Sequence, residues 1–96
     1  MVEFQITSWR QLPAMVTARR DDDVAKVQLA SRFQEAIDEA AMRLGETSSD
    51  EYLAGWARSA WMTGDGEPAD LAADIARRLE TEWTDEAIAK FLDSLG

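Results

Sequence analysis

The stretch FQITSWRQLPAMVTARR, residues 4–20, decides the fold, because it has the pattern of two strands joined by a short connection. Phe4 and Ile6 alternate with polar residues, as apolar residues do in a strand with one buried face. Pro13 cannot donate a backbone hydrogen bond to a sheet, so we place it in the connection or at the very start of the second strand. Alternation resumes over residues 14–19, which completes the second strand.

A third strand follows the turn RRDDD, residues 19–23. It is predicted for VAKVQLA, residues 24–30, in which Val27 and Leu29 lie on one face. Successive strands joined by short turns pair antiparallel. Residues 2–30 are therefore predicted to form a β-meander.

The remainder of the chain has the period of amphipathic helices. Apolar residues recur every three or four positions, which places them on one face of each helix. The predicted helices cover approximately residues 31–44, 52–61, 68–79 and 84–95.

Residues typical of helix ends mark these segments. Ser31 followed by Gln34 has the spacing of a capping box, and Gly45 suits the left-handed position that ends a helix. Pro68 fits the first turn of the third helix, and Thr84 can cap the last.

Gly55 lies inside the second predicted helix. A glycine there costs about 1 kcal/mol relative to alanine. We therefore expect it to allow another element to approach closely.

These patterns predict the class α+β. We expect one domain over residues 1–96, with the meander of residues 2–30 followed by a helical part over residues 31–96. The sheet is predicted to be antiparallel and three-stranded, and to be packed on one face by three to four helices.

The charge is unevenly distributed along the chain. The whole sequence has 10 basic and 19 acidic residues, a net charge of −9. Residues 1–32 hold five basic and four acidic residues, so residues 33–96 hold five and fifteen, a net charge of −10. Such acidity repels phosphate backbones and anionic lipids, so we expect no nucleic-acid partner and no membrane partner.

The beginning of the sequence, MVEFQITSWR, has neither a signal peptide's apolar region nor a span of roughly 20 apolar residues. The sequence also contains no cysteine, which fits a reducing compartment. We expect a soluble, cytoplasmic protein.

Most residue types used in catalysis are missing. Without histidine and cysteine, the chain cannot form the usual triads, a thiol nucleophile or imidazole metal sites. We interpret Asp21, Asp22 and Asp23 as solvated turn residues rather than a magnesium site. The glycines form no phosphate-binding pattern. We therefore expect no autonomous catalysis, no metal and no other cofactor.

Three motifs occur in order along the chain: SWRQLPAMVTAR at residues 8–19, RFQEAIDEAAMRLG at 32–45 and DEYLAGW at 50–56. With these motifs the sequence resembles the stand-alone form of a small bacterial domain family labelled "virulence factor", over roughly residues 2–60. Members of that family occur alone or appended to larger proteins, including one with an iron–sulfur scaffold-like domain and helical repeats. The resemblance implies an accessory or interaction role and supplies no catalytic residues.

Alternation also predicts a binding surface. If the apolar positions of the strands face the helices, then Trp9, Met15, Arg19 and Lys26 lie on the other face, which we expect to be open. The candidate binding residues, for an acidic or aromatic protein partner, are Trp9, Arg10, Met15, Arg19, Lys26 and Arg32. On this hypothesis Trp9→Ala leaves stability within about 1 kcal/mol of the parent.

Two alternatives remain open from the sequence. Trp9 could pack against a helix end or the sheet rim while the arginines pair with nearby carboxylates. The protein could also be an enzyme or a small-molecule-binding protein that uses carboxylates with Arg10 and Arg32.

Overall fold

The meander of the first thirty residues forms the centre of the sheet. The computed structural model describes residues 2–45 and 49–95. Strand β1 (Val2–Trp9) pairs antiparallel with β2 (Leu12–Arg20), and β2 pairs antiparallel with β3 (Asp23–Gln28). The turn residues Arg10 and Asp21 have φ angles of 54°. The predicted antiparallel meander is confirmed.

The sheet has five strands rather than the predicted three, because the described segment from Ser49 to Gly64 is mostly not helical. It forms the short helix α2 (Ser49–Ala54), then β4 (Trp56–Arg58) and β5 (Met62–Gly64). Both strands pair antiparallel with β1 along the edge that β2 leaves free. Of the predicted helix over residues 52–61, residues 52–54 are helical in α2, and the prediction is wrong beyond Ala54. Pairing with β1 satisfies backbone groups that would otherwise remain at an open edge.

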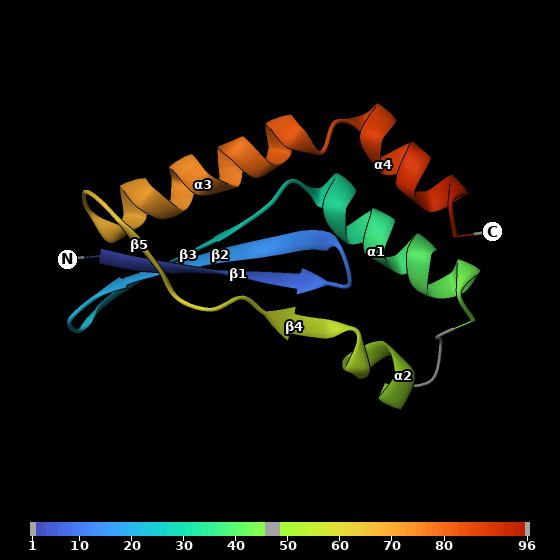
Figure 1. Ribbon diagram of the computed structural model, residues 1–96, viewed down its shortest axis with the longest axis horizontal. Helices are drawn as coiled ribbons and strands as arrows, with labels where there is room; N and C mark the ends of the chain where they lie inside the picture. Colours follow the sequence, from blue (N-terminus) through green and yellow to red (C-terminus); the bar gives the residue numbers. More distant parts are fainter. Residues whose placement is uncertain (1, 46–48, 96) are drawn as a thin grey trace.

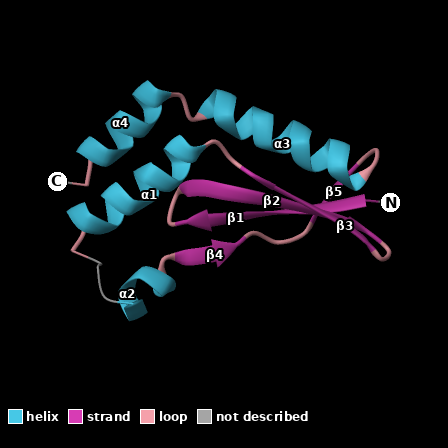
Figure 2. Cartoon of the chain, turned by 180° about the vertical axis from the view of Figure 1, so that it is seen from behind, coloured by secondary structure: helices cyan, strands magenta, loops and turns pink. Residues whose placement is uncertain are grey.

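Three longer helices accompany the sheet (Figure 1). Helix α3 (Pro68–Glu82) packs against β2 and β3, while α1 (Ser31–Arg43) contacts β2 and α4 (Asp85–Asp93). Seen from behind, α3 and α4 follow one another along one side of the molecule, and α1 lies beside α4 (Figure 2). The α+β class is confirmed. No helix in the described ranges is long and apolar enough to cross a membrane.

Three of the predicted helix-end residues have the expected role, and one does not. Gly45 has φ 72°, Pro68 begins α3, and Thr84 Oγ1 accepts a hydrogen bond from the Ala87 N–H at 3.1 Å. The predicted cap at Ser31 is wrong, because the N-cap of α1 is the residue before it, with no side-chain cap.

Replacing Thr84 with alanine removes the side-chain acceptor at the start of α4. We expect this change to lower the free energy of unfolding by about 1 kcal/mol, the usual cost of losing an N-cap. Chemical denaturation would measure it. Thr84→Ser is the matched control and should retain most of the stability. Equal losses in both variants would contradict a capping role.

The fully buried core joins the sheet to α1. Its largest side chains are Trp9, Phe33, Leu12, Ile37, Val2 and Val16. The predicted exposure of Trp9 is thus wrong, since its side chain is 0% exposed.

Alternation along β1 does place Trp9 on the face opposite α3, but α2 and β4 cover it there. The Tyr52 ring stacks on the indole with 5.9 Å between ring centroids, and Trp9 Nε1–H donates to Tyr52 O at 2.8 Å. Trp56 is paired directly with Trp9 across β4 and β1. The segment that was predicted to be a helix is therefore the cover that buries this tryptophan.

A β-bulge brings Leu12 to the same side as Trp9. Thr7 pairs with Met15 and Ser8 with Pro13, so Ala14 is an extra residue in β2. One extra residue reverses the alternation of a strand beyond it. Leu12, paired with Trp9, is consequently 0% exposed.

Candidate functional site

The face of the sheet opposite α3 carries rows of side chains from residues that are paired across neighbouring strands. Paired residues of antiparallel strands point to the same face. Val16 and Ala18, which point toward α3, are fully buried, whereas the residues that alternate with them are partly exposed. We call this second face the open face. Its rows are Glu3–Arg19–Val24, Gln5–Thr17–Lys26 and Arg58–Thr7–Met15–Gln28.

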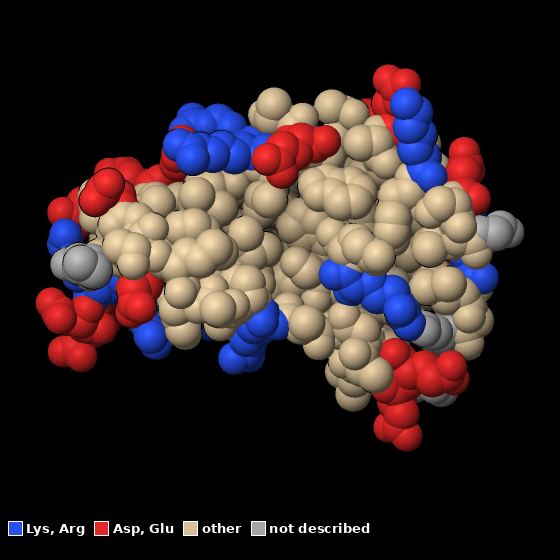
Figure 3. All heavy atoms as spheres, viewed as in Figure 1, with Lys and Arg blue, Asp and Glu red and all other residues tan. Residues whose placement is uncertain are grey.

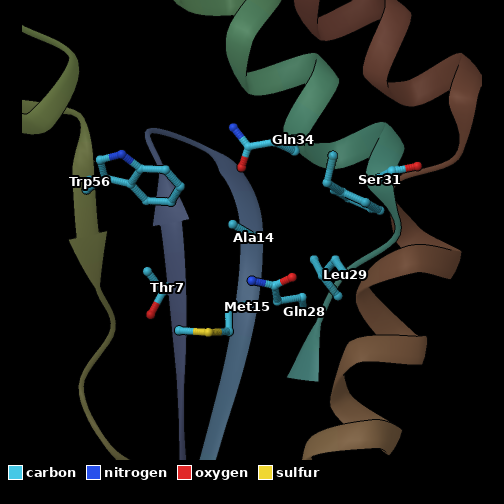
Figure 4. Close-up of a pocket in the computed structure, with 9 residues that line it drawn as sticks. Thr7, Ala14, Met15, Gln28, Leu29, Ser31, Gln34 and Trp56 are labelled. Carbon is cyan, nitrogen blue, oxygen red and sulfur yellow. The ribbon is translucent and has the colours of Figure 1, made fainter. Parts of the chain in front are cut away.

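One end of the open face is hollowed, with a volume of about 630 Å³. The row Thr7–Met15–Gln28 forms its floor, Trp56 stands on the β4 side, and Gln34 of α1 stands at the end (Figure 4). Among the described residues that line the hollow, none is charged. The lining consists of Thr7, Ala14, Met15, Gln28, Leu29, Ser31, Phe33, Gln34 and Trp56. The hollow thus combines apolar walls with hydroxyl and amide groups.

The other end of the open face is filled by the segment between β4 and β5. The Arg19 guanidinium lies 3.7 Å from the centroid of the Trp61 ring, and its Nε is 3.4 Å from Glu3 Oε1. Gln5 Nε2 donates to Ser59 O at 2.9 Å. Contacts within the chain therefore hold Arg19 in place.

Lys26 and Arg58 differ from Arg19 in their contacts. Both are exposed on the open face, and neither forms an ion pair with any residue in the part of the chain that the structure describes. Ion pairs do occupy Arg19, Arg20, Arg32, Arg43, Arg77, Arg78 and Lys90. The open face therefore presents two cations that have no carboxylate partner among the described residues.

On the face seen in Figure 3, acidic side chains gather at the β2–β3 turn, around α2 and around α4, and a further group lies beside cations over α3. Neutral side chains occupy most of the centre. Asp21, Asp22 and Asp23 are all exposed at that turn. In the described ranges, no three carboxylates come together in an arrangement that could hold a metal ion.

The predicted binding residues lie in four places. Met15 lines the hollow, while Lys26 and Arg19 lie on the same open face. Trp9 belongs to the core, and Arg10 lies at the β1–β2 turn with its guanidinium 5.4 Å from the Trp9 ring centroid.

Arg32 lies at the corner between α3 and α4. Its Nη2 donates to Glu80 O at 2.9 Å, and its Nε is 3.5 Å from Asp85 Oδ1. A guanidinium bonded to the carbonyls at a helix C-terminus satisfies groups that the helix itself leaves without donors. Arg32 thus joins α1 to the C-terminal helices and does not line the hollow.

Two open-face residues were missed, namely Trp56 and Arg58. Both belong to β4. Because the apolar residues of this segment recur with the period of a helix, the segment was predicted to be helical. Only Gly55, directly before this strand, indicated an interruption.

One protein-family model, described as "Virulence factor", matches residues 7–92. The match continues beyond residue 60 through α3 and most of α4, and it includes every residue that lines the hollow. No curated protein and no solved structure matches the chain significantly.

Proposed function

Because this chain belongs to the virulence-factor family, we propose that it is a cytosolic accessory module that binds another protein through the open face of its sheet. The observation that carries the proposal is the hollow, where Met15 and Trp56 lie partly exposed on a sheet face that α3 does not cover. Methionine and aromatic residues are enriched in protein interfaces, and tryptophan is frequent among the residues that dominate binding.

The chemistry of the hollow supports binding rather than catalysis. The chain has no histidine or cysteine, and the described residues that line the hollow supply hydroxyl, amide, thioether, aromatic and aliphatic groups but no charged side chain. General acid–base catalysis needs an ionisable group within hydrogen-bond reach of the substrate. We accordingly propose that the module has no catalytic activity of its own.

One observation favours small-molecule binding as a second candidate. The hollow's volume of about 630 Å³ lies within the range of about 300 to 1,000 Å³ typical of small-ligand sites. Arg10 and Arg32 do not line it, so such a ligand would be held by Trp56, Met15 and the amides. Native mass spectrometry of the protein purified from its host would test this, since a retained small molecule adds a defined mass.

Placing a carboxylate in the hollow tests the protein-binding proposal. Met15→Glu puts a charge between apolar walls, and we expect it to weaken partner binding at least about tenfold, because the charge loses water on binding without gaining a partner. Capture from the native host with quantitative mass spectrometry, followed by affinity measurement on the purified partner, gives the result.

Ala73→Glu, on an exposed position of α3, adds the same charge away from the open face and should bind like the parent. Circular dichroism must show that both variants are folded. If Met15→Glu and the parent bind the same partners with equal affinity, the open face is not the interface.

A further inference from the structure

The open face carries charged residues as well as an apolar hollow, and the strand pairing fixes where the cations lie relative to the hollow. Arg58 is directly opposite Thr7, in the row that forms the floor of the hollow. Lys26 is in the adjacent row, one strand beyond Met15. The two cations therefore lie on either side of the Met15 side chain.

Their separation follows from sheet geometry. Arg58 and Lys26 are three strand spacings apart in the order β4-β1-β2-β3, and two residues apart along the strand direction. With strands about 4.8 Å apart and about 3.4 Å between residues, their Cα atoms are roughly 16 Å apart. An extended chain covers this distance with roughly five residues.

The charges of this face oppose those of the chain as a whole. The protein has a net charge of −9, yet the described rows of its open face carry Arg19, Lys26 and Arg58 and only one carboxylate, Glu3, which pairs with Arg19. In the described part of the chain, no carboxylate pairs with Lys26 or Arg58. Complementary potentials select and orient partners more than they add affinity.

Resting on the proposed function, we propose that the partner presents an acidic, extended segment that crosses the strands of the open face. One apolar or aromatic side chain of that segment enters the hollow between Met15 and Trp56. Carboxylates about five residues apart, on either side of that anchor, pair with Lys26 and Arg58.

A protein carboxylate fits this face better than a nucleic-acid phosphate. A nucleic acid brings a charge at every nucleotide, which the net charge of −9 repels, and two widely spaced cations neutralise few of them. Two carboxylates around one apolar group match the number and spacing of the cations.

Selection from random peptides displayed on phage tests the proposal without knowledge of the native partner. The immobilised proteins are the parent, Met15→Glu, the double variant Lys26→Glu with Arg58→Glu, and the double variant Arg77→Glu with Arg78→Glu. The last changes the net charge by the same amount on exposed arginines of α3.

We expect the parent to enrich peptides with an apolar or aromatic residue between acidic residues, and the α3 variant to enrich the same ones. The best of these peptides should bind the Lys26 and Arg58 variant about tenfold more weakly, as two exposed ion pairs are lost and replaced by repulsion. The difference should shrink at high salt. The charge-reversed face should itself select basic peptides.

The outcomes test separately whether the open face binds a partner and whether that partner is acidic. Peptides enriched on the parent over Met15→Glu, but with no acidic preference, would overturn the acidic partner and leave the binding face intact. If the parent enriches no peptides relative to Met15→Glu, the proposal that the open face is the binding surface is overturned as well. Tighter binding of a single-stranded oligonucleotide than of any selected peptide would also overturn the acidic partner.

Discussion

Trp9→Ala is expected to lower the free energy of unfolding by about 3 to 5 kcal/mol, the usual cost of truncating a fully buried aromatic residue. The side chain is 0% exposed, stacks on Tyr52 and donates to Tyr52 O. Its loss leaves a cavity and a carbonyl without its donor. This expectation replaces the loss of less than about 1 kcal/mol that follows from an exposed tryptophan.

Chemical denaturation of Trp9→Ala beside Phe33→Ala gives the comparison, because Phe33 is also 0% exposed. The two losses should be similar. Trp9→Phe retains an aromatic ring but lacks the indole N–H, so it should cost less than alanine. If Trp9→Ala is as stable as the parent, Trp9 does not contribute to the core in the way that its contacts with α2 and β4 imply.

Gly55→Ala is expected to destabilise the fold by about 2 to 3 kcal/mol, as overpacking of a rigid core does. An added Cβ atom would lie 2.5 Å from Trp9 Nε1 and 2.6 Å from Trp9 Cε2. The indole is held by its hydrogen bond and is fully buried, so it has little room to move. The change therefore forces β4 away from β1.

Gly64→Ala is the matched control. Its Cβ would meet the methyl groups of Leu71 at 2.6 and 2.9 Å, and these can rotate away. It should cost less than Gly55→Ala. In a Trp9→Phe background, where the Nε1 atom is absent, the cost of Gly55→Ala should also fall. A cost that is unchanged by Trp9→Phe would mean that the clash has another origin.

The alternation of apolar and polar residues predicted much of the sheet, because successive side chains of a strand point to opposite faces and only one face of these strands is fully buried. It gave the three strands of the meander and placed Met15, Arg19 and Lys26 on the face away from α3. The predicted close approach at Gly55 is confirmed, since the Trp9 indole lies against it.

The rest could not be predicted, because β4 has only three residues, Trp56–Arg58, which is too few to show alternation. Tyr52 and Trp56 are four residues apart, which also fits a helix. Burial of Trp9 depends on which distant segment covers it, and local periodicity carries no information on that. The hollow was missed for the same reason, since Trp56 forms one of its walls.

The position of β1 between β2 and the strands β4 and β5 has a consequence for synthesis of the chain. Strand β1 leaves the ribosome before β4 and β5, yet its second edge is completed by residues 56–64. Until these emerge, a nascent chain exposes an unpaired strand edge and an uncovered tryptophan, the features that promote association between chains. Closing this edge joins segments about fifty residues apart, and contacts of such long range slow folding. The interval between translation of β1 and of β4 is thus the period in which a newly made chain is most exposed to association with other chains.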